Sequence, residues 1–202
     1  MVSLRRLDWV LMGAVLLLVA LSALLVWSAT AHRVDLTDGD STAYLRKQLV
    51  NIAIGLGLLL AVTFVDHRTV RILAPLVYLL SVAGLVLVLF VGSTINGSRS
   101  WLYVGGLSVQ PSEFAKLAVV IGMALVLAER ASTRWRRRVG TVEVVLMLAI
   151  AGVPAVLILL QPDLGTMLVL SATVFGVLAV SGARRRWLVA VLLGAASVAV
   201  VA

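Results

Sequence analysis

Stretches of about twenty apolar residues recur along the whole chain, and they decide what it can fold into. Seven such segments occupy residues 9–30, 48–65, 72–92, 112–129, 142–160, 164–182 and 187–202. A hydrocarbon core about 30 Å thick is crossed by roughly 20 helical residues that rise about 1.5 Å each. The first six segments reach that length or approach it. The sequence therefore predicts an all-α fold, a polytopic transmembrane helical bundle with six full spans and a partial seventh.

The composition agrees with the membrane class. Hydrophobic residues make up 62% of the chain and its mean hydropathy is +1.13, whereas soluble domains are about half apolar. Cysteine is absent, which excludes disulfides, thiolate metal sites and thiol redox motifs. The two histidines, His32 and His67, are far apart, which argues against a histidine metal centre. Nothing indicates a linker, so residues 1–202 are expected to form one integral-membrane domain.

Arginine is concentrated in alternate connections between the apolar segments. One set of connections carries Arg5, Arg6, Arg68, Arg71, Arg130, Arg134, Arg136, Arg137, Arg138, Arg184, Arg185 and Arg186. The opposite set holds Arg33, Arg46, Lys47 and Arg99, together with Asp35, Asp38 and Asp40. Cytoplasmic loops are enriched in Lys and Arg, so the amino terminus is predicted to be cytoplasmic. The net charge of +8 then indicates contacts with anionic membrane lipids rather than with nucleic acid.

Both ends of the sequence invite a second interpretation. A secretory signal is resembled by Arg5-Arg6, the apolar run after them and Ala29-Thr30-Ala31. The apolar run is longer than the roughly 7–15 residues usual in such a signal. An uncleaved first span is favoured. The last segment would reach only about 24 Å and has no polar cap beyond it. We therefore expect a chain truncated at its carboxyl end, or a gene fragment.

The first candidate site lies in residues 96–116, in a loop predicted to face outward. Pro111 suits the first helical position, where a missing N–H costs nothing. Glu113 then falls in the first turn, where the helix dipole favours a carboxylate, and Lys116 follows on the same face. An unpaired ion in the bilayer core costs about 2.5–3.5 kcal/mol, so the pair predicts a polar cavity. The alternative is an interfacial acid beside a lysine that extends to water.

The second candidate is the stretch QPDLGT at residues 161–166, between the fifth and sixth spans. This stretch has the same pattern as the first candidate site, because a Gln-Pro step again precedes an acidic residue at a helix start predicted to face outward. Gln110 and Gln161 are therefore matching candidates. Close packing of the fourth and sixth spans would bring Glu113 and Asp163 to one cavity. The alternative is a tight turn in which Asp163 caps a helix.

Arg99 and Trp101 form the third candidate. An outward arginine beside a tryptophan can hold a phosphate, with the ring at the level of the lipid headgroups. The same two residues also suit an ordinary interfacial anchor, and the sequence leaves both interpretations open.

These segments together resemble the signatures of a known family. QPSEFAK at residues 110–116 resembles the most recognisable signature of the shape, elongation, division and sporulation (SEDS) family, the RodA/FtsW-type membrane glycosyltransferases. QPDLGT at 161–166 is similar to its second motif. Residues 96–106 match the loop before the first signature, and VWSAT at 26–30 falls where the family ends its first span. Residues 6–9 and 44–49 look closer to the RodA branch.

The resemblance implies a peptidoglycan glycosyltransferase that joins lipid II, a polyprenyl-pyrophosphate precursor, into glycan strands. It would work on the outer face of the bacterial cytoplasmic membrane, in cell elongation, cell-shape control and cell division. The implied partner is a class B penicillin-binding protein. The family's catalytic aspartate lies in an outward loop beyond the region present here, so the resemblance assigns no catalytic residue to this chain.

The resulting hypothesis is a polar cavity that opens to the outer leaflet. Lys116 would balance phosphate charge, Glu113 would position Lys116 or a bound cation, and Asp163 would complete the wall. A divalent cation suits pyrophosphate chemistry, although these residues present no evident ligand set. Two other functions fit the same features: a transporter (flippase) of lipid-linked precursors, and a non-catalytic scaffold that docks a penicillin-binding protein.

Overall fold

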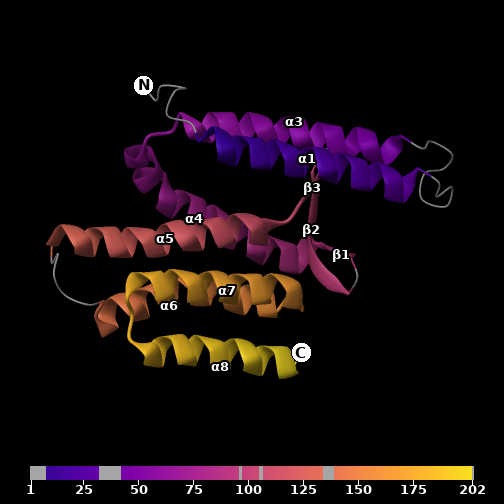
Figure 1. The fold of residues 1–202 in the computed structure, drawn as a ribbon. Helices are drawn as coiled ribbons and strands as arrows, with labels where there is room; N and C mark the ends of the chain where they lie inside the picture. Colours follow the sequence, from indigo (N-terminus) through magenta and orange to yellow (C-terminus); the bar gives the residue numbers. More distant parts are fainter. Residues whose placement is uncertain (1–7, 32–41, 96, 105–106, 134–138, 202) are drawn as a thin grey trace. The chain divides into compact units, whose positions relative to one another are not determined.

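The helices follow the predicted apolar segments, and three short strands lie between two of them. The computed structural model describes residues 8–31, 42–95, 97–104, 107–133 and 139–201. The helices are α1 (Trp9–Thr30), α3 (Ala43–Thr63), α4 (His67–Val91), α5 (Pro111–Thr133), α6 (Thr141–Leu159), α7 (Leu164–Ser181) and α8 (Arg185–Val201), as Figure 1 shows. The strands are β1 (Ser93–Ile95), β2 (Ser98–Val104) and β3 (Leu107–Val109).

The predicted multi-pass helical bundle is confirmed. Six helices, α1 and α3 to α7, are long and apolar enough to cross a membrane, within the residues that the structure describes. The seventh predicted segment forms α8, which has 17 residues. The three short strands were not predicted; they lie in the connection between α4 and α5. The loop residues at 5–6, 32–40, 96, 105–106 and 134–138 lie outside the described residues.

The chain divides into two compact units, residues 1–67 and 68–202. The first unit is the pair α1 and α3, which pack together. Gln48 Nε2 of α3 donates a hydrogen bond of 2.8 Å to Ser22 Oγ of α1. Lipid supplies no hydrophobic drive for helix association, so such bonds and close packing hold helices together. The single domain expected from the sequence stays a prediction.

The core of the second unit is built from α5, α6 and α7, which pack against one another, while α8 packs on α7. The buried residues of α7 recur every fourth position, which places them on one face of the helix. They are Thr166, Leu170, Val174 and Leu178. The core also includes Met123 of α5, Met147 of α6 and Leu85 of α4, all fully buried.

The antiparallel sheet β1-β2-β3 leads the chain from α4 into α5. Gly97 lies between β1 and β2 with φ +86°, a conformation that glycine adopts without steric cost. Ser98 pairs with Ile95, and Leu102 pairs with Val109. The strand β2 also contacts α5. The sheet therefore fixes the place where α5 begins.

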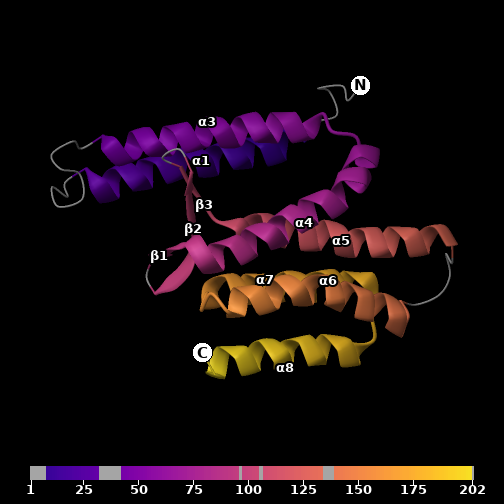
Figure 2. The same cartoon turned by 180° about the vertical axis from the view of Figure 1, so that it is seen from behind.

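Helix α4 is inclined to α5 and does not run alongside it over its whole length. Figures 1 and 2, seen from opposite sides, show α4 diverging from α5 toward the ends at which α4 begins and α5 finishes. One bond ties α4 to α6: the Tyr78 hydroxyl donates to the Ile150 carbonyl at 2.9 Å. Pro154, four residues after Ile150, has no N–H to offer that carbonyl. Tyr78 supplies the donor that proline removes.

Candidate functional site

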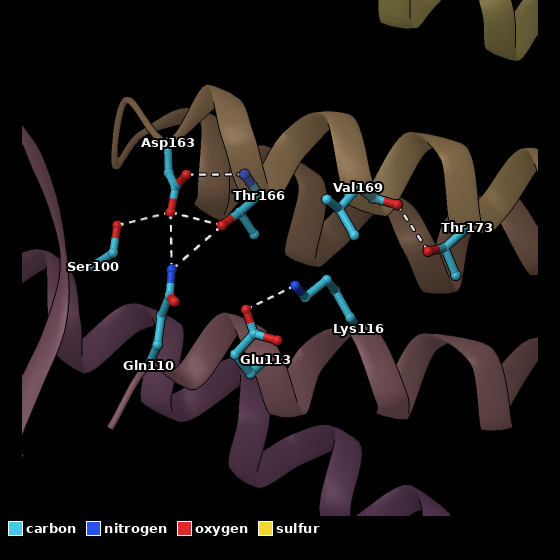
Figure 3. Close-up of polar contacts among 8 residues, drawn as sticks. All are labelled: Ser100, Gln110, Glu113, Lys116, Asp163, Thr166, Val169 and Thr173. Carbon is cyan, nitrogen blue, oxygen red and sulfur yellow. Dashed lines mark hydrogen bonds and ion pairs between the residues drawn. The ribbon is translucent and has the colours of Figure 1, made fainter. Parts of the chain in front are cut away.

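Asp163 is the centre of a polar cluster at the start of α7 (Figure 3). As the N-cap residue, it accepts a hydrogen bond from the Thr166 backbone N–H at Oδ1, 3.0 Å away. Its Oδ2 accepts three more: from Thr166 Oγ1 at 2.8 Å, Gln110 Nε2 at 3.0 Å and Ser100 Oγ at 3.1 Å. We call Ser100, Gln110, Asp163 and Thr166 the Asp163 cluster. It joins β2, the entry to α5 and the start of α7.

The local sequence explains each donor. An aspartate at the N-cap with a threonine three residues on is a favourable helix start, since the carboxylate accepts from the exposed N–H groups. Gln110 precedes Pro111, the first residue of α5. Ser100 is 1% exposed in β2 and shares a hydrogen bond with Ser98. A carboxylate has about four acceptor positions, so Asp163 is largely occupied within the protein.

Glu113 and Lys116 form an ion pair beside this cluster. Lys116 Nζ lies 2.8 Å from Glu113 Oε1, and the Lys116 side chain is 16% exposed while that of Glu113 is 57% exposed. Figure 3 shows both side chains between α5 and α7, on the same side as Asp163. The positive ends of two helix dipoles meet there. The expected positions of Pro111 at the helix start and Glu113 in the first turn are confirmed.

Gln161 points in another direction. It is 1% exposed, and its Nε2 donates to the Leu85 carbonyl of α4 at 3.1 Å. Its own carbonyl accepts a hydrogen bond of 3.1 Å from Ser98 Oγ of β2. Gln161 therefore fastens the turn between α6 and α7 to α4 and to the sheet. This contact positions Asp163, two residues further on.

Arg99 and Trp101 lie on β2, outside the Asp163 cluster. Arg99 Nη1 donates to the Leu89 carbonyl at 3.2 Å, so its charge lies at the carboxyl end of α4, where the helix dipole favours a cation. Its side chain is exposed, and Trp101 is half-buried. A phosphate contact for these two residues stays a prediction.

Four residues predicted from the sequence, Gln110, Glu113, Lys116 and Asp163, lie at one place in the structure. Ser98, Ser100 and Thr166 fell within the predicted stretches but were given no role. The capping role of Asp163, given above as an alternative, is confirmed, and because such a cap accepts from the N–H two or three residues on, it could have identified Thr166. The serines of β2 carry no such local signal. Among the described residues, no group of three or more His, Asp or Glu side chains is placed to hold a metal ion.

Comparisons with known proteins find close relatives. Residues 8–202 match the family model FTSW_RODA_SPOVE, described as cell cycle protein. Stage V sporulation protein E of Bacillus subtilis is 37% identical over 179 residues, which are 88% of this chain and 48% of the relative. The probable peptidoglycan glycosyltransferase FtsW of Nitrosococcus halophilus is 37% identical over 198 residues, 96% of this chain and 50% of the relative. The chain thus spans about half the length of these relatives.

Solved structures share the fold. The crystal structure of the rod shape determining protein RodA of Thermus thermophilus matches with a TM-score of 0.76 and 34% identity, over 97% of this chain and 60% of that one. A chain of a peptidoglycan synthase complex, described as coordinating polymerization and crosslinking, matches with a TM-score of 0.70 and 32% identity. This match covers 94% of the present chain and 52% of the other.

Proposed function

Because this chain belongs to the FtsW, RodA and SpoVE family, we propose that it forms the lipid-substrate side of a peptidoglycan glycosyltransferase in the bacterial inner membrane. The enzyme would join lipid II into glycan strands in cell elongation, cell-shape control and cell division. The relative from Nitrosococcus halophilus is named a probable peptidoglycan glycosyltransferase, and the present chain is a multi-pass membrane protein, which suits a substrate anchored in the membrane by a polyprenyl chain.

The Glu113–Lys116 pair is the observation that supports this proposal most strongly. A lysine whose side chain is only 16% exposed in an apolar helix is rare in membrane spans and is a candidate functional residue, even where it is paired as here. Here it lies at the start of α5, next to the start of α7, where two helix dipoles add positive potential. A pyrophosphate headgroup is the anion in lipid II, and it would find both a cation and helix amino termini there.

The residues divide into two roles on this proposal. Lys116 would exchange part of its contact with Glu113 for a phosphate oxygen, and Glu113 would hold the ammonium group in place before the substrate arrives. The Asp163 cluster would keep the starts of α5 and α7 in register, because Asp163 accepts bonds from Gln110 and Thr166 at once. Arg99 and Trp101 would meet the headgroup from the sheet, and a divalent cation would have to take its ligands from substrate and carboxylates together.

A class B penicillin-binding protein is the proposed partner. One structural neighbour of this chain belongs to a peptidoglycan synthase complex that combines polymerization with crosslinking. A polymerase that makes strands requires a crosslinking enzyme nearby, which supports the same arrangement here.

Charge-neutral replacement tests the function. Lys116→Met and Glu113→Gln keep the side-chain volume and remove one charge each. The test uses a full-length chain, in which the part of the family's length that is not spanned here is added. In that chain, Lys116→Met should lower lipid II polymerisation by at least about a hundredfold, the loss typical of a removed electrostatic contact. Arg185→Gln, an exposed position at the other end of the second unit, is the control and should retain activity. Unchanged polymerisation in both site variants, or lipid flipping without strand formation, would refute the proposal.

A further inference from the structure

Asn51 places a primary amide near the middle of a membrane-spanning helix. It is the ninth of the 21 residues of α3, which is long and apolar enough to cross a membrane, so it lies roughly 12 Å from the start of the helix. Its side chain is exposed and has no hydrogen-bond partner among the residues that the structure describes. Lipid tails offer an amide neither donor nor acceptor, and an unpaired polar group in an apolar medium raises the free energy. Asn51 therefore calls for a partner that the helix pair α1 and α3 does not supply.

The Asn51 side chain points away from the contact between α3 and α1. The two helices lie side by side, and Gln48 of α3 donates to Ser22 of α1 (Figures 1 and 2). The half-buried positions of α3 recur at the spacing of one helix face that includes Gln48; they are Leu45, Gln48, Ile52, Leu56, Leu59 and Thr63. Asn51 precedes Ile52, which places it about 100° around the helix from that face.

The residues that share the side of Asn51 are apolar or small. Gly55, Leu58 and Val62 follow at four, seven and eleven positions, so they lie on one face with Asn51, and all are exposed. We call these four residues the Asn51 face. A Cβ added at Gly55 would meet nothing within 4 Å, so the backbone of another helix can come close there. Lys47 lies nearer the start of α3, with its ammonium 5.8 Å from the centre of the Tyr44 ring, so the Asn51 face itself carries no charge.

We propose that the Asn51 face pairs with the same face of a second copy of this chain. A primary amide has two N–H donors and one carbonyl acceptor, so two Asn51 side chains related by a two-fold axis satisfy each other with two reciprocal hydrogen bonds. Both copies insert with the same orientation, because both carry the same arginine distribution, and the two α3 helices then run parallel. The face has no charge to select an acidic or basic partner, whereas its amide is complementary to itself.

Disulfide cross-linking tests this pairing directly, because the chain has no cysteine of its own. Leu58→Cys places one thiol on the Asn51 face, and Leu60→Cys places one about 180° around α3. The two leucines are 59% and 50% exposed, so they form a matched pair. After oxidation in bacterial membranes, we expect Leu58→Cys to link two differently tagged copies about tenfold faster than Leu60→Cys, since a disulfide requires Cα atoms within roughly 7 Å.

Replacement of the amide separates its role from that of the apolar surface. In the Leu58→Cys background, Asn51→Leu should lower cross-linking by about tenfold, and Asn51→Gln, which keeps an amide, should restore most of it. Asn51 is exposed, so neither change burdens the folding of the helix pair. Thermal unfolding of the variants in detergent should match that of the parent.

Three results would overturn the proposal. The first is equal cross-linking by Leu58→Cys and Leu60→Cys, and the second is cross-linking that Asn51→Leu leaves unchanged. The third is a photo-crosslinker at position 51 that captures a different protein, or another part of the same chain, instead of a second copy. Capture of a second copy at this position supports it.

Discussion

At the scale of single residues, Asp163 carries more structural contacts than its place in a short turn suggests. It caps α7 and also accepts side-chain bonds from Ser100 and Gln110, on two other elements. Removal of its carboxylate takes one acceptor from each of three partly buried side-chain donors, which costs more than loss of the cap alone. The expected cost is therefore larger than that of an ordinary N-cap substitution.

The chain offers a matched comparison for this residue. Asp8 is the N-cap of α1, and it accepts from the backbone N–H groups of Val10 and Leu11. We expect Asp163→Ala to lower the free energy of unfolding by roughly 2–4 kcal/mol and Asp8→Ala by about 1 kcal/mol. Thermal unfolding in detergent, followed by circular dichroism, measures the difference. Equal shifts in the two variants would mean that the bonds from Ser100 and Gln110 contribute little.

The sequence indicated Glu113, Lys116 and Asp163 but not the contact of Asp163 with Ser100, for a physical reason. Glu113, Lys116 and Asp163 stand at helix starts, which local signals such as a Gln-Pro step and a dipole-favoured acid identify. Ser100 meets Asp163 across 63 positions of chain. That contact depends on where β2 lies against the helices, which no local pattern determines. The direction of the Gln161 side chain, toward Leu85, depends on the same packing.

At the scale of elements, the hydrogen bond from Tyr78 of α4 to the Ile150 carbonyl of α6 compensates for a backbone donor that Pro154 lacks. Pro154 removes the N–H that would bond to the Ile150 carbonyl, and Tyr78 from α4 supplies a hydroxyl in its place. In lipid an unsatisfied carbonyl finds no water, so this bond matters only while proline is present. The two residues should therefore be energetically coupled.

A double-mutant cycle measures this coupling. Tyr78→Phe alone should destabilise the protein by about 1–3 kcal/mol, because the Ile150 carbonyl loses its donor. In a Pro154→Ala background the helix regains its own N–H, so Tyr78→Phe should then cost less than about 0.5 kcal/mol. Unfolding in detergent reports each value. Additive effects would show that Tyr78 does not act on the carbonyl that proline leaves free.

Elements also differ in how well the sequence predicts them. The ends of α1 match the predicted segment 9–30, because apolar length alone defines a membrane helix. The strands of the α4–α5 connection were missed. β1 and β3 have three residues each, and such short strands form only because the sheet and its contacts with α5 hold them. Short segments carry too little pattern for a local prediction.

At the scale of the whole molecule, the two ends of the second unit differ in charge and in role. One end collects the Asp163 cluster, the sheet and the start of α5. The other collects arginines: Arg130 of α5 lies 3.2 Å from Glu143 of α6, and Arg186 of α8 donates to Thr141 of α6. The arrangement agrees with the alternation of basic loops that the sequence shows. From this charge distribution we infer that the Asp163 cluster faces outward.

The absence of cysteine makes that assignment directly measurable. Single-cysteine variants at Glu113 and Arg185 place one thiol at each end of the second unit. A membrane-impermeant maleimide added to intact cells should label Glu113→Cys, since that side chain is 57% exposed at the outward start of α5. Arg185→Cys should react only after the membrane is permeabilised. The reverse pattern, or a thiol at position 113 that stays unlabelled in permeabilised cells as well, would contradict an outward-facing polar site.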